Sequence, residues 1–463
     1  MIMLAIVKKG ISYLLLFWVI GVLITGVLYP AFQKKPPENS HPTAAADPNA
    51  PTERVRCIDD NDEALIRRLQ VIESAKEKLV LSTYYLGRDE SGTDIMSALL
   101  HAADRGVNIR ILVDGFCNLT SLSSSDSFKA LVQSPNVEAK IYNPVHILWP
   151  WRANYRMHDK YLAADDQVYI LGGRNTRNVS LGSYQEKKDI DRDMLVYSEK
   201  PGDSLHQVLA YFEGIWNQPI AKLVKEGRRP KQEARAALEQ HYIELQTRYP
   251  EAFEETDFEA LTLPVKSVTL LTNPQEPHNK VPTLWASLVD YMQQGRDLLI
   301  QTPYIICNRQ MYEDLTSLTQ QGRRLRFITN TSEYGANPCG CADYLNNKKK
   351  LLNTGAELWE YAGGNSCHTK TVLIDDHISI VGSFNFDMRS AYLDTEMMLV
   401  IDSPELNRSL RALDDEYMSK SRGTMPDGST LTGENYIVPP NSFGRKLFYG
   451  LLRAVILPVR HLL

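Results

Sequence analysis

The stretch His158-Asp159-Lys160 returns 210 residues later as His368-Thr369-Lys370. In each copy an Asp follows the His by seven residues and an Asn follows it by seventeen, giving Asp165 and Asn175, then Asp375 and Asn385. Chance rarely places four residue types at the same offsets twice. The chain therefore contains an internal repeat, and a pair of unrelated core histidines does not explain it.

Each copy is predicted to present polar groups at one rim of a sheet. Side chains alternate along a strand, so His158 and Lys160 share a face, as do His368 and Lys370. The apolar runs 167–171 and 377–381 predict short buried strands that end in Gly-Gly and Gly-Ser, where the backbone turns sharply. An imidazole, an ammonium and an amide at such a rim suit an anion, with phosphate as the leading candidate.

Two such rims facing each other would place one histidine on each side of a phosphorus atom. One histidine can attack as a nucleophile while the other protonates the leaving oxygen. Two Lys and two Asn would hold the non-bridging oxygens and stabilise the charge that develops on them.

The motif His-x-Lys-x4-Asp, present twice and followed each time by Gly-Gly/Ser-x-Asn, resembles the signature of the phospholipase D superfamily. Segment 382–397 is similar to the second motif of bacterial cardiolipin synthases of the C-type, and segments 156–160 and 172–175 are similar to the first. The resemblance covers roughly residues 55–420. Asp394 is a departure, because the resemblance leads us to expect Asn there, and it bears on fine positioning.

The resemblance implies a covalent phosphatidyl-histidine intermediate. We assign His158 as nucleophile and His368 as general acid and base, with the reverse assignment left open. Lys160 and Lys370 complete the catalytic motif with Asp165 and Asp375, whose own role is expected to be structural. The remaining implied residues bind the substrate phosphate (Asn175, Asn385 and Ser383) or orient a histidine (Glu396 and Asp193). We expect no metal and no cofactor.

The expected reaction is phosphatidyl transfer between membrane phospholipids, with cardiolipin formed from phosphatidylglycerol and a second phospholipid. Water as the acceptor would instead make the enzyme a phospholipase D that releases phosphatidic acid. A phosphodiesterase-type nuclease is a weaker alternative, because the net charge of -5 and the pI near 6.1 give no basic footprint. A catalytically dead scaffold is disfavoured by the intact residues of both copies. The expected partners are a phospholipid bilayer and its lipids, with no nucleic acid; a partner protein in the membrane is left open.

The predicted fold class is α/β, with two duplicated phospholipase D-type α/β/α sandwich halves and the active site between them. Helices are expected over 62–75, 94–104, 284–294 and 310–320, and strands over 78–85, 107–114, 297–304 and 324–329. The two halves repeat this order, so the duplication spans more than the motifs. The predicted domains are residues 55–220 and 263–425, joined by a helical connection over 221–262.

Residues 1–35 are predicted to be an uncleaved signal anchor, because the segment from Ile11 to Tyr29 is almost wholly apolar and long enough to cross a bilayer. A cleaved signal peptide is the competing interpretation. A Pro/Ala-rich linker over 36–54 follows. Lysines on both sides of the apolar run leave the orientation open. We expect a bacterial inner membrane, and favour a periplasmic catalytic body.

Two further segments bear on the membrane. The aromatic stretch Val145–Trp151 is predicted to be either a packed loop or a lip that touches lipid. The tail 426–463 ends in a helix with an apolar stripe among basic residues, which suits an anionic membrane surface, with docking on the protein core as the alternative. The six cysteines show no zinc spacing, and their disulfide state is left open.

Overall fold

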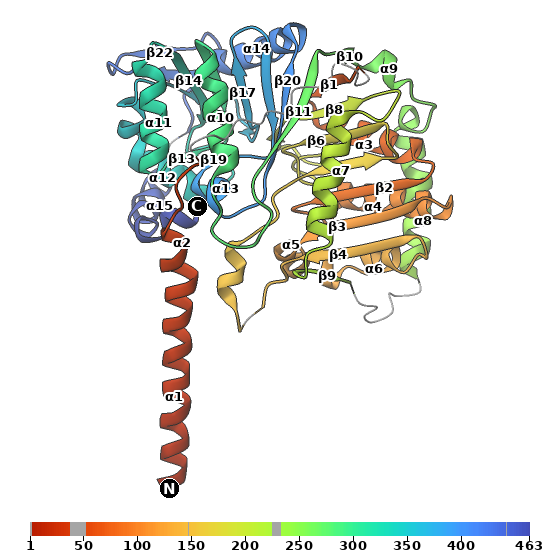
Figure 1. Cartoon of the computed structure of the whole chain (residues 1–463), viewed down its shortest axis with the longest axis horizontal. Coiled ribbons are helices and arrows are strands. Elements are labelled where there is room, and N and C mark those ends of the chain that lie inside the picture. The colour runs from red at the N-terminus through yellow and green to blue at the C-terminus, as the bar shows by residue number, and fades with distance from the viewer. Residues whose placement is uncertain (1, 38–51, 147, 225–232, 441) are drawn as a thin grey trace.

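The computed structural model describes residues 2–37, 52–146, 148–224, 233–440 and 442–463, with side chains from residue 12 onward. Two nine-stranded sheets form the body (Figure 1), and eight strands of each correspond in order, from β1 to β9 in the first and from β11 to β21 in the second; β10 and β22 have no counterpart. The first order is β10-β1-β8-β6-β5-β2-β3-β4-β9 and the second is β11-β20-β18-β17-β12-β14-β15-β21-β22. The predicted duplication of whole half-domains is thereby confirmed.

The first half and the connection contain these elements in chain order: β1 (Arg54–Ile58), α3 (Asn61–Ser74), β2 (Lys78–Thr83), α4 (Glu90–Asp104), β3 (Asn108–Asp114), α5 (Gly115–Thr120), η2 (Leu122–Ser124), α6 (Asp126–Val132), β4 (Val137–Tyr142), η3 (Pro150–Asn154), β5 (Tyr161–Ala164), β6 (Val168–Gly172), β7 (Asp189–Ile190), β8 (Asp193–Tyr197), α7 (Asp203–Trp216), β9 (Ala221–Leu223), α8 (Glu233–Arg248), η4 (Pro250–Ala252), α9 (Phe258–Leu261) and β10 (Leu263–Pro264).

The second half contains β11 (Ser267–Thr272), α10 (Thr283–Gln294), β12 (Asp297–Gln301), β13 (Ile305–Ile306), α11 (Arg309–Gln320), β14 (Arg324–Asn330), α12 (Pro338–Leu352), β15 (Glu357–Tyr361), β16 (Ser366–Cys367), β17 (Thr371–Ile374), β18 (Ile378–Gly382), β19 (Phe386–Asp387), α13 (Met388–Tyr392), β20 (Met397–Asp402), α14 (Pro404–Ser419), β21 (Ser421–Thr424) and β22 (Thr430–Thr432), and the tail contains α15 (Phe443–Val455) and η5 (Leu457–Leu462).

Three apolar cores explain why the halves are two sandwiches that share an interface. Helices α3, α4, α6 and α8 pack on the outer face of the first sheet, while α10, α11 and α12 pack on the outer face of the second. The third core lies between the sheets and takes residues from both, including Phe212 of α7 and Leu410 of α14. Burial of this shared core holds the two rims in register across the interface.

The boundaries of the halves differ slightly from those predicted. Residues 263–264 form β10, which pairs with β1, so the second sheet begins at Ser267 rather than at residue 263. The second sheet also extends to Thr432 through the hairpin of β21 and β22. The predicted connection is helical in α8, and its buried Leu238 and Tyr242 cover the outer core of the first half. Most of the predicted linker over 36–54 lies outside the described residues.

The N-terminal helix projects from the body (Figure 1) and consists of α1 (Ile2–Leu23), a π-helical turn η1 (Ile24–Leu28) and α2 (Tyr29–Ala31). Its segment Ser12–Ala31 has a mean hydropathy of 2.2 with 6% of it buried, which makes it a candidate membrane span. Its upper end is fixed to the body, because the side-chain amides of Asn154 and Asn279 donate to the carbonyls of Gly26 and Tyr29 at 2.7 Å each.

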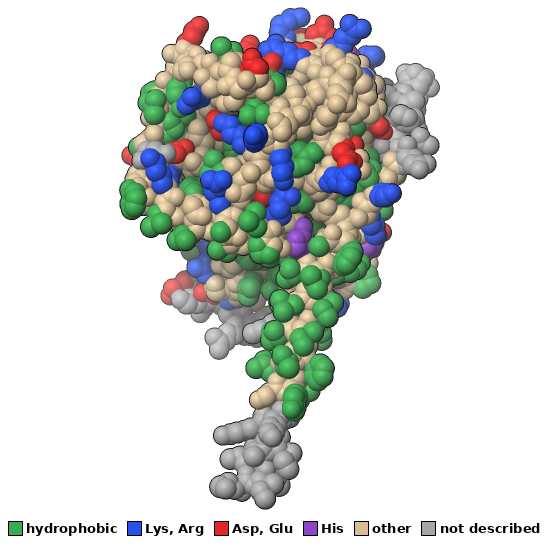
Figure 2. Space-filling model, turned by 90° about the vertical axis from the view of Figure 1, so that its left-hand side faces the viewer, with side chains coloured by type: hydrophobic (Ala, Val, Ile, Leu, Met, Phe, Trp, Pro, Cys, Tyr) green, Lys and Arg blue, Asp and Glu red, His purple; other side chains and the backbone are tan. Residues whose placement is uncertain are grey.

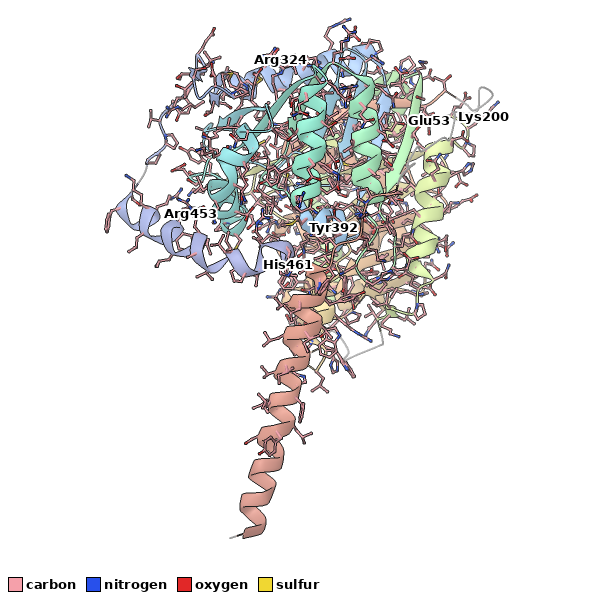
Figure 3. All side chains as sticks on the ribbon, turned by 60° about the vertical axis from the view of Figure 1, so that its left-hand side comes forward. Glu53, Lys200, Arg324, Tyr392, Arg453 and His461 are labelled. Carbon is pink, nitrogen blue, oxygen red and sulfur yellow. The ribbon has the colours of Figure 1, made fainter. Side chains whose placement is uncertain are left out.

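The C-terminal tail lies beside the point where this helix leaves the body (Figures 1 and 3). His461 Nε2 is 2.7 Å from the carbonyl oxygen of Val27, and Tyr449 and Ile456 pack against α12. Helix α15 is thus docked on the protein by one face. Its opposite face exposes Phe443, Leu447, Phe448, Leu451 and Val455.

Candidate active site between the two halves

The two motif histidines are positioned by backbone contacts that cross between the halves. The His158 N–H donates to the carbonyl of Thr395 at 3.2 Å, and the His368 N–H donates to the carbonyl of Ile190 at 2.7 Å. The short strands β7 and β16 pair across the same interface, and Met157 bridges to Thr395. The carbonyl that receives each histidine belongs to the residue just before an acid of the other half, so each imidazole is brought to a carboxylate.

The first pair consists of His158 and Glu396, whose Nδ1 and Oε1 atoms lie 2.8 Å apart. Glu396 also accepts hydrogen bonds from the hydroxyls of Ser383 at 2.5 Å and Ser390 at 2.6 Å. Burial raises the pKa of Glu396 to about 7, against the opposing effect of Lys160 and the two serines. The predicted contact between Glu396 and a histidine is present, and its partner is the histidine of the first half.

The second pair consists of His368 and Asp191, with Nδ1 and Oδ2 2.6 Å apart. Lys370 lies 3.6 Å from the same carboxylate oxygen, and the backbone N–H of Arg192 donates to Oδ1 at 2.8 Å. Burial would raise the pKa of Asp191, but Lys370 and His368 outweigh it and hold the pKa well below its usual range. This carboxylate is therefore ionised.

The prediction that Asp193 orients a histidine is wrong, because the strand register places Asp191 there. Gly172 pairs with Asp193, whereas Gly382, its counterpart in the second motif, pairs with Met398. Asp193 and Met398 are therefore equivalent positions, and the residues two places before them, Asp191 and Glu396, are equivalent as well. Gly173 explains how the acid fits, since a Cβ atom there would lie 2.3 Å from Asp191 Oδ1.

Asp193 belongs instead to a buried ion-pair cluster. Its Oδ2 lies 2.8 Å from Arg68 and 3.3 Å from Arg174, and none of the three side chains is more than 9% exposed. The cluster ties α3 to the strand that leads to Asn175. Its role is to support the rim from behind.

The two motif lysines are buried within the rims. Lys160 and Lys370 are 3% and 1% exposed, and each Nζ donates to the backbone carbonyl of its own motif histidine. Burial lowers the pKa of Lys160 to about 8 and also lowers that of Lys370. Each ammonium group therefore lies beside its own motif histidine.

The two motif asparagines have unsatisfied amide groups. The Oδ1 atoms of Asn175 and Asn385 are buried, and no hydrogen-bond partner for either is found in the described part of the chain. Asn385 Nδ2 donates to the hydroxyl of Tyr304 at 3.2 Å. Because a carboxamide presents a donor or an acceptor by rotating, both groups suit the predicted contact with substrate oxygens.

Ser383 does not fit its predicted phosphate-binding role. Its side chain is fully buried and its hydroxyl is used by the carboxylate of Glu396. The residue therefore stabilises the acid that holds His158. The equivalent position of the first half is Gly173, so the hydroxyl is a feature of one half alone.

Asp165 and Asp375 lie at the opposite ends of their strands from the histidines. Both have positive φ values, 50° and 48°, and their carboxylates accept hydrogen bonds from backbone amides. Asp165 receives the N–H groups of residues 76–78 at 3.0 Å, and Asp375 those of Arg296 and Asp297 at 2.8 Å. The structure corrects their inclusion among the catalytic residues and agrees with the expected structural role, since they fix turns that anchor the motif strands.

The electrostatics of the two imidazoles differ in degree. Burial, Lys160 and Lys370 lower the pKa of His158 well below its usual value. Burial and Lys370 also lower the pKa of His368, but Asp191 opposes them. Both side chains keep some exposure, 14% for His158 and 16% for His368, so a substrate can reach them. Before substrate binds, His158 is the more strongly neutral of the two.

Two contributors to the site were missed by sequence reasoning. Asp191 was passed over for Asp193 because the segment between Asn175 and the acid is longer in the first half than in the second. Ser390 lies in a helix, α13, that has no counterpart at the same offset. Asp191 and Asp193 are both candidates in the sequence, and only the strand register decides between them.

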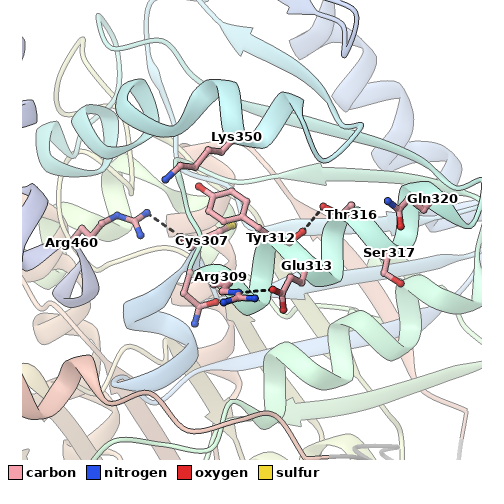
Figure 4. Close-up of a pocket in the computed structure, with 10 residues that line it drawn as sticks. Cys307, Arg309, Tyr312, Glu313, Thr316, Ser317, Gln320, Lys350 and Arg460 are labelled. Atoms are coloured by element: carbon pink, nitrogen blue, oxygen red, sulfur yellow. Dashed lines mark hydrogen bonds and ion pairs between the residues drawn. The ribbon is translucent and has the colours of Figure 1, made fainter.

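The structure also contains a pocket away from the histidines, of about 670 Å³, at the start of α11 (Figure 4). Its cations are partly neutralised, because Arg309 pairs with Glu313 at 2.7 Å and Arg460 pairs with Asp343 at 2.9 Å. Within the described ranges, no cluster of three or more His, Cys, Asp or Glu side chains could hold a metal ion. All six cysteines are free thiols.

Comparison with known proteins identifies the repeat. A family model described as "Cardiolipin synthase, PLD-like domain" matches residues 69–216 and 288–415, which together exceed half of the chain. Among curated relatives, cardiolipin synthase C of Escherichia coli is 26% identical over 382 residues, covering 74% of this chain and 80% of the relative. Cardiolipin synthase B of Salmonella typhi is 25% identical over 360 residues, covering 77% and 78%.

Among solved structures, the phosphatidylserine synthase of Haemophilus influenzae superposes with a TM-score of 0.60. The two sequences are 18% identical, and the match covers 90% of this chain and 98% of that one. At this identity the likeness concerns the fold, and it confirms the predicted arrangement of two halves.

Proposed function

The chain belongs to the cardiolipin synthase, phospholipase D-like family, and on that premise we propose that it transfers a phosphatidyl group between two phospholipids to form cardiolipin. One lipid is phosphatidylglycerol, and the transfer passes through a covalent phosphatidyl-histidine. The observation that carries the proposal is the pair of crossed contacts, His158 with Glu396 and His368 with Asp191. Two imidazoles, each held by an acid of the opposite half, are what a two-step displacement at phosphorus requires.

In the first step, His158 Nε2 attacks the phosphorus of the donor lipid. Nδ1 is already bonded to Glu396, so Nε2 is the nitrogen left to react. The N–P bond forms while the bond from phosphorus to the leaving head-group oxygen breaks, and its electron pair goes to that oxygen. His368 enters this step as an imidazolium, gives its Nε2 proton to the oxygen and keeps its Nδ1 proton bonded to Asp191, and the head-group alcohol departs. Lys160 and Lys370 stabilise the charge on the non-bridging oxygens.

In the second step, the glycerol hydroxyl of phosphatidylglycerol replaces the departed alcohol. His368 removes its proton, the hydroxyl oxygen bonds to phosphorus, and the N–P bond to His158 breaks. The product is a lipid with two phosphatidyl groups on one glycerol, and both histidines return to their starting states. Water in place of the lipid alcohol would give phosphatidic acid by the same sequence, so this hydrolysis is the second candidate function.

The different surroundings of the two pairs support the assignment of roles. A neutral imidazole is needed for attack. The pKa of His158 is lowered further than that of His368, because the ionised Asp191 opposes the lowering at His368. A proton donor is helped by a nearby carboxylate, and Asp191 provides one for His368. We therefore keep His158 as the nucleophile and His368 as the acid and base.

The surface around the projecting helix supports a membrane substrate. Exposed large apolar side chains occur on α5, β9, α15, the start of η5 and the loop before η3, which lie at the end of the body from which α1 projects (Figure 1). We call this set the apolar underside, and its residues are Phe116, Leu119, Leu148, Trp149, Leu223, Phe443, Leu447, Phe448, Leu451, Val455 and Leu457. Figure 2 shows hydrophobic side chains along this edge and on the helix itself.

With the helix inserted in a bilayer, the apolar underside would rest on the same leaflet. The loop before η3 and α15 would then contact lipid, which is one of the two alternatives that the sequence left open for each segment. A body held in this way lies against the phospholipid head groups. This geometry favours lipids over dissolved phosphodiesters and nucleic acid as substrates.

Product analysis tests the proposal. The full chain is incorporated into mixed micelles of labelled phosphatidylglycerol and phosphatidylethanolamine, with the His158→Ala variant as the blank. Cardiolipin with release of glycerol or ethanolamine is expected, and the released alcohol identifies the donor. Phosphatidic acid alone would replace transfer by hydrolysis, and neither product would refute both.

A further inference from the structure

A second hollow of about 840 Å³ lies between the N-terminal helix and the first half. Thr25 and Tyr29 of the candidate span form one wall, and a second wall is formed by η3 and the loop before it, which carries Trp149 and which we call the aromatic loop. The edge of the first sheet at Lys222 and residues 277–278 of the second half complete the lining. Trp149, Trp151 and Tyr155 supply aromatic surface, while Arg152 and Lys222 supply positive charge. We call this hollow the span pocket.

The charge of the span pocket is one-sided. Neither an Asp nor a Glu is among the residues that line it. Arg152 lies over the Trp149 ring, 5.6 Å from its centroid. Within the described ranges, no ion pair is found between a carboxylate and either Arg152 or Lys222. The pocket at the start of α11 is different, because Glu313 and Asp343 neutralise two of its cations. An occupant of the span pocket therefore gains by carrying negative charge.

The span pocket lies against the candidate membrane span. Trp18, inside the candidate span, donates its indole N–H to the carbonyl of Leu148 at 3.2 Å. Gly26 lies so close to Trp151 that a Cβ atom at residue 26 would stand 3.4 Å from the Trp151 Cβ. The aromatic loop thus descends along the helix for more than two turns, from Gly26 to Trp18. With the helix inserted in a bilayer, a molecule between the loop and the helix would lie beside acyl chains.

The span pocket is joined to the segment that carries His158. Asn143, which lines it, donates its side-chain N–H groups to the carbonyls of Arg152 and Tyr155 at 2.7 and 2.8 Å. Arg156 donates to the carbonyls of Asn143 and Arg152 at 3.0 Å each. Two residues further on is His158. A ligand in the pocket therefore rests against the backbone that leads into the active site.

We propose that the span pocket binds one anionic phospholipid taken from the bilayer, with its phosphate at Arg152 and Lys222 and its chains along Trp149, Trp151 and the helix. The aromatic walls suit the glycerol and upper chain region, and two unpaired cations suit a phosphodiester. The inference rests on the proposed function: the span pocket would hold one of the two phospholipid substrates close to the active site, where the other lipid reacts.

The test uses the full chain carrying His158→Ala, so that no turnover consumes the lipid. This protein is reconstituted in vesicles of phosphatidylcholine that contain a photoactivatable phosphatidylglycerol, and cross-linked peptides are identified by mass spectrometry. Cross-links to residues 149–155 are expected. The added pair Arg152→Glu and Lys222→Glu should reduce them at least fivefold, whereas the charge-matched pair Lys200→Glu and Arg408→Glu, on exposed sites far from the pocket, should not.

Two outcomes would overturn the proposal. One is an equal yield of cross-links at residues 149–155 in both charge-reversed proteins; the other is loss of the cross-links when inorganic phosphate is added, which would identify a site for free phosphate. Thermal unfolding of both proteins shows whether each is folded. The cross-linking result is independent of product formation, so a failed proposed function and an empty pocket give different patterns.

Discussion

The His158–Glu396 and His368–Asp191 pairs have the same geometry and opposite electrostatics. Both use Nδ1 at a short distance from a carboxylate, 2.8 and 2.6 Å. Glu396 is surrounded by serine hydroxyls and its pKa is raised to about 7, whereas Asp191 lies by Lys370 and its pKa is lowered. Duplication thus supplied a symmetric frame, and neighbouring side chains made the two histidines unequal.

The largest effect is expected from removal of either histidine. His158→Ala and His368→Ala should each lower cardiolipin formation by about 10⁴-fold or more, because no other group in the site replaces a nucleophile or a proton donor. Rates measured on micelles, with thermal unfolding as the control for folding, check this. Substantial activity in either variant would contradict the two-histidine mechanism and favour one that uses a single histidine.

The next effect separates the two acids. Asp191→Asn removes an ionised carboxylate from His368 and should lower kcat by about 10²–10⁴-fold. Glu396→Gln replaces an acid that is close to half neutral at pH 7 and keeps two serine partners, so a loss of about 10- to 100-fold is expected. Measuring kcat for both variants under the same conditions shows which substitution has the larger effect. An equal loss would contradict the proposed electrostatic difference between the two pairs.

Asp193 offers a contrast in which stability changes more than chemistry. Asp193→Asn leaves Arg68 and Arg174 as buried cations without their common anion, so unfolding free energy should fall by about 3–5 kcal/mol. Thermal or denaturant unfolding measures the loss, and the exposed Asp376→Asn serves as the control. A stable variant with strongly reduced kcat would return Asp193 to a role near the histidines.

A smaller effect concerns pH and the departure at Asp394. Burial raises its pKa to about 7 although Arg389 lies 3.1 Å away. A raised pKa means that the folded state holds more protons between pH 4 and pH 7, so this group's contribution to stability falls as pH rises through that window. Asp394→Asn removes the titration, and the Tm difference between pH 5.5 and pH 8 should shrink. An unchanged difference would contradict the shift.

Much of the fold could be predicted because its signals are local. The repeated motif, the 3.6-residue and 2-residue periods and the glycines after each strand defined two equivalent halves, and the observed helices and strands begin and end within a few residues of those expected. The boundary at residue 263 moved because β10 pairs with β1, a contact between residues about two hundred positions apart. Such pairing has no local signal.

The site was predictable to the extent that its residues share fixed offsets. His158, Lys160, His368 and Lys370 lie where the repeat placed them. Asp191 was missed because its offset from the histidine differs from that of Glu396, and strand pairing alone sets the register. Ser383 was misassigned because the sequence reveals a hydroxyl beside the motif but not the carboxylate that uses it.

The most direct test of the unequal histidines is a burst experiment with phosphatidyl-p-nitrophenol, whose leaving group needs no proton donor. His368→Ala should release about one p-nitrophenolate per enzyme and then stop, with the phosphatidyl group recovered on the peptide that contains residue 158. His158→Ala should release none. A burst in His158→Ala with label on residue 368 would reverse the roles, and no covalent label in either variant would contradict the phosphatidyl-histidine itself.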